Sequence, residues 1–395
     1  MTQPHSLANL TAAAEIMLDF SARTGLSSEK PVRRYLWTDA FALCNFLTLY
    51  QATQEAQYKD LALALIAQVH DILGHHRPDD PRKGWISGLS KEEGRAHPVA
   101  GGLRIGKPLP EREPDAPFDP QLEWERDGQY YHYLTKWMHA LAQAGCILGN
   151  AQFTQWATEL AQVANRAFVY RARDGSTRMH WKMRIDLSAP LVASMGQHDP
   201  LDGLVTCLAL ERAAQLCAPD QTANRLDDEI ALLAQIAQGQ ALETDDPLGL
   251  GGLMFDAGRL LLIASDSPLV PQGLTNRVLQ AALTGCDQYL HQNSLNMPPA
   301  QRLAFRELGL AIGLSLPACL PTANETATDL SLHQIEALTH YQPVHDYIIK
   351  TWRAPQNQRL ESWLAHQDIN SVMLATSLAP ETFLILATPT PSEDA

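Results

Sequence analysis

Residues 36–50, LWTDAFALCNFLTLY, are apolar almost all round when they are wound into an α-helix. A helix without a polar face is buried on all of its sides, so this segment is expected in the interior. The same pattern recurs in the later half of 130–148 and in 203–216, 249–264 and 303–316. These segments predict a set of inner helices.

Other segments alternate with the inner ones and are apolar on one side only. Leu61, Leu65, Val69 and Ile72 form a single stripe, as in an amphipathic helix that buries one face. The segments with this pattern are 56–73, 152–169, 226–238 and 274–290. Fully buried and half-buried helices in alternation predict an all-α toroid, in which an inner ring of helices is wrapped by an outer ring.

About five inner–outer pairs can be recognised in this way, and residues 6–22 together with the region 344–378 would complete a sixth. The predicted fold is therefore an (α/α)6 toroid of six helical hairpins, as a single domain over residues 1–395 with a flexible tail at 388–395. The alternating pattern of a β-strand competes with this interpretation only at TFLILA, residues 382–387.

Two long connections interrupt the helices, at residues 75–128 and 170–199. Both are rich in aromatic and basic residues, and loops longer than about 15 residues in compact domains are usually functional or disordered. Several inner helices begin with an aspartate, as at Asp199-Pro-Leu-Asp-Gly and Asp246-Pro-Leu-Gly, which is a helix start signal. We therefore expect both connections to be active-site loops that roof the end where the inner helices begin.

The composition narrows the functional classes. Apolar residues make up 45% and charged residues 19%, an ordinary globular balance, and 44 acidic against 30 basic residues give a net charge of −14, which disfavours general nucleic-acid binding. No segment reaches the roughly 18 apolar residues of a membrane span, and the first residues lack the basic region of a signal peptide. The six widely spaced cysteines without a CxxC motif predict reduced, mostly buried thiols in a cytoplasmic protein.

Three local stretches carry a resemblance to a known superfamily: RYLWTDAF from Arg34, EWERDGQYYHY from Glu123, and MGQHDPLDG from Met195. With the helical pattern, they resemble the six-hairpin, (α/α)6-toroid superfamily of carbohydrate-active proteins, and within it a bacterial subgroup of unsettled function. That superfamily includes glycoside hydrolases, polysaccharide lyases and N-acylglucosamine 2-epimerase-like isomerases. The resemblance implies activity on sugars. However, the sequence carries no motif of a single glycosidase family from which catalytic residues could be assigned.

Glycoside hydrolysis needs two carboxyl groups, one that donates a proton and one that acts as base or nucleophile. The catalytic candidates at helix starts and on the loops are Asp39, Glu123, Glu125, Asp199 and Glu307. Glu125 or Glu123 would be the general acid and Asp199 the base. Asp39 or Glu307 would hold substrate hydroxyls. The alternatives are structural: pairing with a cation such as Arg34 or Arg306, or N-capping of a helix.

The predicted substrate-binding residues come from the same loops and helix starts. Flat aromatic rings suit the apolar faces of sugars, and Arg and Lys bind carboxylate or phosphate, so an anionic sugar is one option. The alternatives are ordinary packing for the rings and neutralisation of nearby carboxylates for the cations. The full set is Trp37, Trp85, His97, Arg104, Lys107, Trp124, Tyr130, Tyr131, His180, Lys182, Gln197, His198, Asp202 and Arg306.

Hydrolysis of a glycan or sugar derivative is the first functional hypothesis from the sequence. The second is a sugar isomerase, epimerase or lyase in which His180 or His198 removes a proton, and the third is a non-catalytic glycan-binding or scaffold protein. The expected partner is a small-molecule sugar or oligosaccharide, with neither nucleic acid nor a membrane. Because HExxH, zinc-type Cys/His spacing and GxxxxGK[ST] are missing, no metal and no cofactor are expected.

Overall fold

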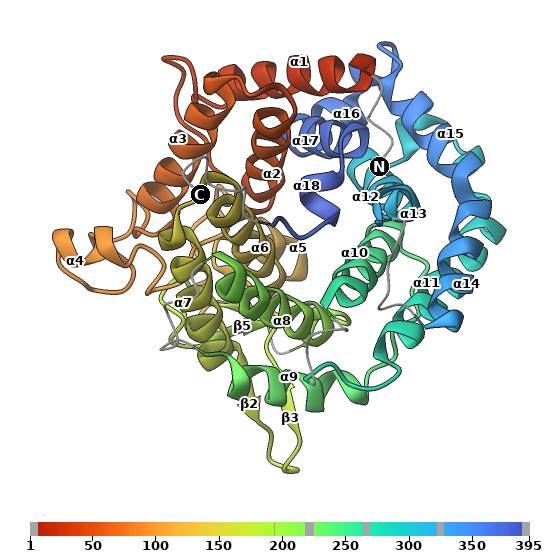
Figure 1. Cartoon of the computed structure of the whole chain (residues 1–395). Coiled ribbons are helices and arrows are strands. Elements are labelled where there is room, and N and C mark those ends of the chain that lie inside the picture. Colours follow the sequence, from red (N-terminus) through yellow and green to blue (C-terminus); the bar gives the residue numbers. More distant parts are fainter. Residues whose placement is uncertain (1–6, 193, 218–224, 264–268, 322–327, 389–395) are drawn as a thin grey trace, which may run out of the picture. The chain divides into compact units, whose positions relative to one another are not determined.

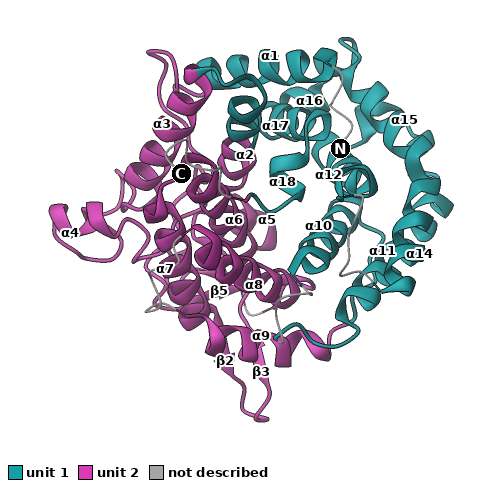
Figure 2. Cartoon of the chain, viewed as in Figure 1, with its two compact units in different colours: residues 1–23, 44–55, 241–387 teal, residues 24–43, 56–240, 388–395 magenta. Residues whose placement is uncertain are grey.

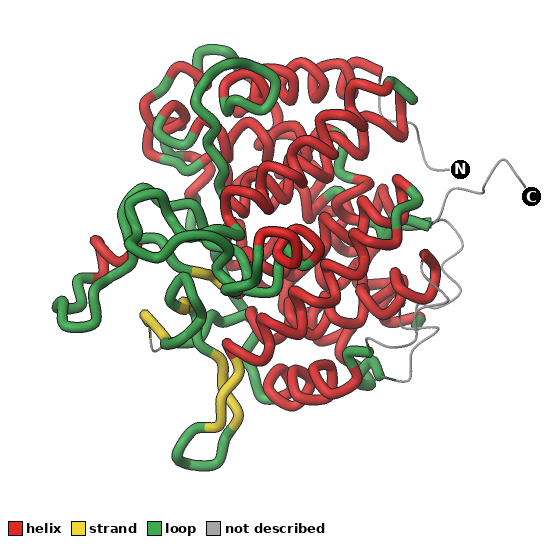
Figure 3. The backbone as a smooth tube through the Cα atoms, turned by 90° about the vertical axis from the view of Figure 1, so that its left-hand side faces the viewer, coloured by secondary structure: helices red, strands yellow, loops and turns green. Residues whose placement is uncertain are grey.

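The computed structural model describes every residue except 1–6, 193, 218–224, 264–268, 322–327 and 389–395, so most of the predicted tail lies outside the described residues (Figure 1). Helices dominate the described part, and its strands are short (Figure 3). The chain divides into two compact units (Figure 2). Unit 1 comprises residues 1–23, 44–55 and 241–387, and unit 2 comprises residues 24–43, 56–240 and 388–395.

Unit 2 holds the first long series of helices and all the strands that the described residues form. Residues 36–43 of α2 (Leu36–Thr53) belong to it, and the rest of α2 belongs to unit 1. Its other elements are α3 (Ala56–Leu73), α4 (Lys91–Ala96), α5 (Pro120–Glu125), β1 (Gln129–Tyr130), α6 (Tyr131–Leu148), α7 (Ala151–Phe168), β2 (Val169–Arg171), β3 (Thr177–Met179), β4 (Lys182–Met183), β5 (Pro190–Val192), α8 (Asp199–Cys217) and α9 (Asp227–Gln238).

Helices α6 and α8 form the interior of unit 2. Nearly every residue of α6 is buried, as are those of the first three turns of α8, and the two helices pack against each other and against α7. Their approach is close, because a Cβ atom at Gly203 would lie only 2.3 Å from the Tyr131 hydroxyl. Helix α7 buries one face alone, since its apolar residues recur at helical spacing.

Unit 1 repeats this division between buried and half-buried helices. Its principal helices are α1 (Leu7–Arg23), α10 (Pro247–Ile263), α11 (Leu274–His291), α12 (Ala304–Leu314), α14 (Asp329–Leu338), α15 (Gln342–Arg353) and α17 (Gln367–Leu378), with short helices α13 (Leu316–Cys319), α16 (Glu361–Leu364) and α18 (Glu381–Leu384). Helix α10 is buried nearly all round and packs against α11 and α12, and α12 packs in turn against α15 and α17. The predicted inner helix at 303–316 corresponds to α12, which ends at Leu314 and is followed by the short α13. The first three residues of TFLILA belong to α18 rather than to a strand.

The two long connections of unit 2 are folded around buried charges. The Asp127 carboxylate is fully buried and accepts hydrogen bonds from Arg104 Nη1 at 2.9 Å, Arg77 Nη1 at 3.3 Å and the Gly106 N–H at 2.9 Å. A carboxylate out of water is stable only when its oxygens are bonded to cations and donors in this way. Asp127 thereby fixes the path of the chain just before β1 and α6.

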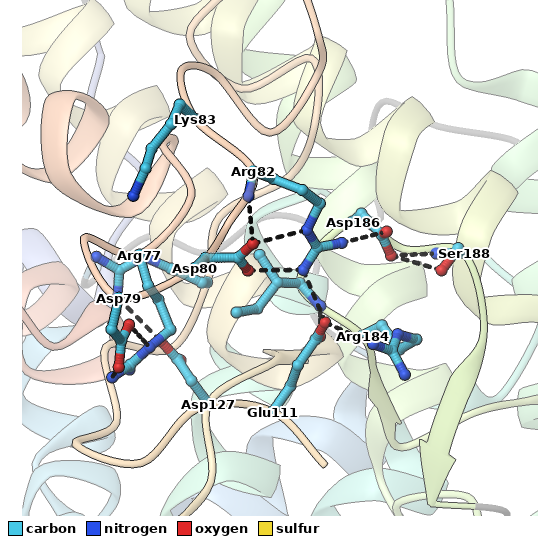
Figure 4. Close-up of polar contacts among 12 residues, drawn as sticks. Arg77, Asp79, Asp80, Arg82, Lys83, Glu111, Asp127, Arg184, Asp186 and Ser188 are labelled. Carbon is cyan, nitrogen blue, oxygen red and sulfur yellow. Dashed lines mark hydrogen bonds and ion pairs between the residues drawn. The ribbon is translucent and has the colours of Figure 1, made fainter. Parts of the chain in front are cut away.

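A second charged network joins the two connections to each other (Figure 4). Arg82 contacts Asp80 at 2.8 Å, Glu111 at 2.8 Å and Asp186 at 2.6 Å. Glu111 also accepts from Arg184 at 2.8 Å, so carboxylates and guanidinium groups alternate across the two segments. In addition, β1 pairs with β4 in antiparallel register, which ties residues 129–130 to residues 182–183.

The cysteines depart from the sequence-based expectation. Cys146 on α6 and Cys217 at the end of α8 form a disulfide with their Cα atoms 5.4 Å apart, while Cys44, Cys207, Cys286 and Cys319 are free and buried. The prediction of six reduced thiols is therefore wrong for two of them, because the packing of α6 against α8 brings together residues 71 positions apart. The bond also removes the thiol argument for a cytoplasmic protein.

Among the described helices, none combines the length and the hydropathy that a bilayer span requires.

We expect Asp127→Asn to lower the free energy of unfolding by about 3–5 kcal/mol, because it leaves two guanidinium groups without their buried counter-charge. Asp79→Asn is the matched control, since the Asp79 side chain is 54% exposed and contacts the same Arg77 at 2.8 Å. Urea denaturation followed by circular dichroism measures both. Equal effects of the two changes would show that the buried network does not hold the loop.

Reduction of the disulfide should lower the free energy of unfolding by about 2–4 kcal/mol, because the bond restricts the unfolded chain. Cys146→Ser should have a similar effect, and Cys286→Ser, at a buried free thiol, serves as the comparison. Alkylation of the denatured protein without reductant, followed by mass spectrometry, should label four of the six cysteines. Labelling of all six would contradict the bond.

Candidate acid–base site

The first two turns of α6 and the first turn of α8 bring two ionisable pairs together in unit 2. On α6 the side chains are His132 and Lys136, and on α8 they are Asp199 and Asp202. His132 Nδ1 lies 3.6 Å from Asp199 Oδ1, and Lys136 Nζ lies 2.8 Å from each oxygen of Asp202. Residues four apart on α6 and three apart on α8 share one face of their helix, so both pairs form between the same two helices.

Asp199 is the carboxyl group most altered by its surroundings. Its pKa is raised to about 7, chiefly by burial and also by the negative charge of Asp202, while the ammonium of Lys136 acts in the opposite direction. Its Oδ2 atom is buried and has no hydrogen-bond partner among the described residues. The backbone of Gly196 packs directly on this carboxylate, since a Cβ atom there would lie 2.4 Å from Oδ2. At neutral pH, Asp199 therefore exists in both protonation states.

His132 is neutral over the same pH range. Its pKa is lowered to about 4, chiefly by burial and also by Lys136, while Asp202 acts in the opposite direction. The side chain is 27% exposed, and the buried Nδ1 atom faces Asp199 without a hydrogen bond. Nε2 has no hydrogen-bond partner in the described part of the chain, so this nitrogen remains available to bind a ligand. A neutral imidazole beside a carboxylate is an arrangement suited to proton transfer.

Aromatic rings surround His132. The ring centroids of Tyr133, Tyr130 and Trp37 lie 4.9, 5.4 and 6.0 Å from that of the imidazole, and the Trp181 ring is nearly parallel to it at 6.4 Å. Trp37 comes from the first turn of α2 and Trp181 from the residue before β4. The indole Nε1 of Trp37 is a further buried donor without a partner in the described residues. Buried polar atoms are normally paired, so unpaired ones gathered at a cluster leave hydrogen bonds available for a ligand.

Beyond Trp181 lies a more open part of the cluster, formed by Lys107, Trp124 and Glu125. The Trp124 ring stacks on that of Trp181 at 5.8 Å and is 47% exposed. Lys107 Nζ lies 5.1 Å from the centroid of the Trp124 ring. Glu125 is exposed at the end of α5.

Several predicted catalytic carboxylates are held in structural ion pairs. Glu123 is buried between Lys182 Nζ at 2.9 Å and Arg112 Nε at 3.0 Å, and all three ammonium protons of Lys182 point at acceptors. Asp39 is buried, contacts Arg34 at 3.1 Å and accepts from the Tyr35 N–H, which is the pairing that the sequence offered as the alternative to catalysis.

The two predicted site residues of unit 1 are also paired. Glu307 is buried, accepts from two nitrogens of Arg302 at 2.6 Å each and from Trp352 Nε1 at 2.8 Å. Arg306 forms an ion pair with Asp246. The partner of Glu307 is therefore Arg302 rather than the adjacent Arg306 that the sequence suggested.

Other predicted binding residues serve the packing of unit 2. Arg104 is committed to Asp127 and to two backbone carbonyls. Trp85 is buried and packs its ring on His75 at 3.9 Å. Tyr131 is buried and donates to Asn165 Oδ1 at 3.0 Å. These three contacts hold the loop and the inner helices in place.

The remaining predicted binding residues are His97, His180, Gln197 and His198. His97 is 58% exposed and contacts Glu159 at 3.0 Å, and the His180 ring stacks on Tyr170 at 4.1 Å. Gln197 is exposed, and the His198 carbonyl accepts from the Asp202 N–H at 2.9 Å at the start of α8. His180 and His198 thus differ from His132, which the sequence interpretation overlooked as a base.

A signal for His132 was present in the sequence. It stands in EWERDGQYYHY, four residues before Lys136, and the segment that follows is an inner helix. A His and a Lys one turn apart at the start of a buried helix, opposite two aspartates three apart, favour a polar cluster. Among the described residues, no group of three His, Cys, Asp or Glu side chains could hold a metal ion.

No protein-family model matches the sequence, and no curated protein matches it either. Solved structures do match. A GH76 α-mannanase from Bacteroides thetaiotaomicron aligns over 95% of this chain and 97% of its own with a TM-score of 0.54 at 9% identity. A D-mannose isomerase aligns over 96% and 99% with a TM-score of 0.50 at 14% identity. A cellobiose 2-epimerase from Spirochaeta thermophila aligns over 94% and 98% with a TM-score of 0.51 at 10% identity. The chain thus has the all-α, (α/α)6-toroid fold of these proteins, as its sequence predicts.

Proposed function

We propose that this chain is a carbohydrate-active enzyme that moves protons on a sugar through His132, assisted by Asp199. The observation that carries the proposal is the pair itself, an imidazole 3.6 Å from a buried carboxyl whose pKa is raised to about 7. The surrounding aromatic rings suit the apolar faces of a sugar. The proteins that share the fold include, by their descriptions, a mannanase, a mannose isomerase and a cellobiose epimerase, which all act on sugars.

Within this class, isomerisation or epimerisation fits the geometry best. Nε2 of His132 would take the proton from the carbon next to the carbonyl of an open-chain sugar. The C–H electron pair forms the C=C bond of an enediolate: the carbonyl oxygen takes the proton of the neighbouring hydroxyl, whose oxygen is left with the negative charge. Return of the first proton from the imidazolium to the former carbonyl carbon re-forms the carbonyl at the former hydroxyl and gives an isomer. Return of a proton to the other face of the original carbon, with the hydroxyl proton moving back, re-forms the original carbonyl and gives an epimer.

Asp199 is a positioning residue in this mechanism. Its carboxylate faces Nδ1 of the imidazole, just beyond hydrogen-bond distance, and a hydrogen bond there would hold the N–H at Nδ1 and leave Nε2 as the base. The negative charge would also stabilise the imidazolium that forms when Nε2 accepts a proton. Asp199 assists only when it is ionised, so the raised pKa of its carboxyl group links the activity to pH near 7.

Hydrolysis is the second candidate, and one observation favours it. Glu125 is an exposed carboxylate next to Trp124. The Trp124 ring stacks on that of Trp181, which in turn stacks on the imidazole of His132. Glu125 could serve with Asp199 as the carboxyl pair that glycoside hydrolysis requires. Glu123 is less suited to the role of acid, because Lys182 and Arg112 bind both of its oxygens.

We expect kcat/KM to rise with pH and to level off above about 7, because ionisation of Asp199 activates His132. Asp199→Asn should remove this pH dependence and lower kcat by roughly 10²–10⁴-fold, and His132→Gln should lower it at least as much. Matched controls are Asp174→Asn and His97→Gln, at exposed positions. Wild-type kinetics in Asp199→Asn and His132→Gln, on a sugar that the enzyme converts, would refute the roles given to this pair.

Incubation with reducing sugars in D2O, followed by proton NMR, separates the two reactions. An isomerase or epimerase should place deuterium on the carbon next to the carbonyl and form a new sugar without cleavage, because a base-bound proton exchanges with solvent. Hydrolysis should instead form new reducing ends from an oligosaccharide without deuterium on carbon. Failure of every tested mono- and oligosaccharide to react would favour a non-catalytic binding protein.

A further inference from the structure

Lys107 stands out among the cations of the loop 75–128. Its backbone is fixed, because its carbonyl accepts from Arg77 Nη1 at 2.7 Å and its N–H donates to Asp127 at 3.3 Å. Its ammonium lies 5.6 Å from the centroid of the Tyr35 ring and 5.1 Å from that of the Trp124 ring. Both distances are those of a cation held against aromatic faces.

The ammonium of Lys107 lacks the carboxylate partner that neighbouring cations of the loops have. Arg77, Arg104, Arg112 and Lys182 each contact a carboxylate at 2.8–3.0 Å, whereas no carboxylate in the described residues lies within 4 Å of Lys107 Nζ. Burial lowers the pKa of Lys107, and the charges of Glu125 and Asp127 raise it only from longer range. The positive charge is thus partly removed from water and left without an ion pair.

The same ammonium adjoins a row of stacked rings. Trp124, 47% exposed, stacks on Trp181 with an angle of 30° between the ring planes, and Trp181 lies at 9° to His132. The rings of Trp124, Trp181 and His132 thus follow one another at centroid distances of 5.8 and 6.4 Å, between the Lys107 ammonium and the imidazole.

We infer that Lys107, Tyr35 and Trp124 form a subsite for an acidic group, so that the substrate is an anionic sugar. The acidic group is a carboxylate or a phosphate on the end of the sugar away from the carbonyl carbon, as in a uronate or a sugar 6-phosphate. This inference rests on the proposed function of the His132 site. The anion would complete the missing ion pair of Lys107, and the Trp124 ring would cover the apolar face of the sugar.

The inference can be tested by calorimetric binding to Asp199→Asn, a background in which turnover is suppressed. The ligands are D-glucose, D-glucuronate and D-glucose 6-phosphate, the corresponding mannose compounds, and inorganic phosphate alone. Anionic sugars should bind about tenfold more tightly than their neutral counterparts, which corresponds to about 1.4 kcal/mol, because the anion forms a charge-assisted hydrogen bond with the ammonium. Preference for the uronate or for the phosphate ester identifies which anion the subsite takes.

Changes of single residues sharpen the test. Lys107→Gln should weaken the binding of anionic sugars about tenfold and leave neutral sugars within twofold. Glu125→Gln should strengthen anionic binding at low salt, because it removes a nearby negative charge. Trp124→Ala should weaken both kinds of sugar. Lys83→Gln is the matched control, since Lys83 is an exposed lysine of the same loop.

The possible failures are distinguishable. If neutral sugars bind and are converted while anionic sugars gain nothing, or if Lys107→Gln weakens both alike, the anionic subsite is refuted and the proposed function stands. If none of these sugars binds, both fail. Binding of inorganic phosphate that Lys107→Gln leaves unchanged, without preference for anionic sugars, also overturns the assignment.

Discussion

The buried carboxylate of Asp127 is the contact on which the rest of unit 2 depends. It binds Arg77 near the start of the loop 75–128, and it binds Arg104 and the N–H groups of Gly106 and Lys107 from a later part of the same loop. Because the chain continues directly into β1 and α6, the same contact also positions Tyr130 and His132. The loop is therefore ordered by buried charges as well as by its buried apolar side chains, among them Val99, Leu103 and Ile105.

Ion pairing distinguishes the carboxylates that stabilise the fold from the one to which we assign a chemical role. Glu123, Asp39 and Glu307 each have a cation within hydrogen-bond distance, and burial is tolerable for that reason. Asp199 instead has a buried Oδ2 atom without a partner in the described residues. A carboxyl group kept under such conditions stabilises nothing evident in the fold, and perturbed groups of this kind mark functional sites more often than structural ones.

The sequence predicts the helices well because the spacing of apolar residues along the chain reflects which faces of each helix are buried. Residues 56–73 match α3, and the apolar segment at 249–264 matches α10 to within a turn. It also places Asp199 at the start of an inner helix. The partners of individual side chains are harder to predict from the sequence. Glu307 pairs with Arg302 rather than with Arg306, and Cys146 bonds to Cys217, because of side-chain directions that only the packed helices define. His132 escaped notice because a histidine among three tyrosines is typical of ordinary aromatic packing.

The ion pair of Lys136 and Asp202 explains why burial controls the titration of the site. Lys136 lowers and Asp202 raises the pKa of both His132 and Asp199, so the two charges offset each other at either group. What remains is the loss of water around each side chain, which disfavours the charged form of both. In the reaction proposed above, a substrate that covers the cluster would remove more water, and it would also supply polar atoms for the imidazole and the carboxylate. The protonation state of the pair would then respond to what occupies the site, as the proposed acid–base role requires.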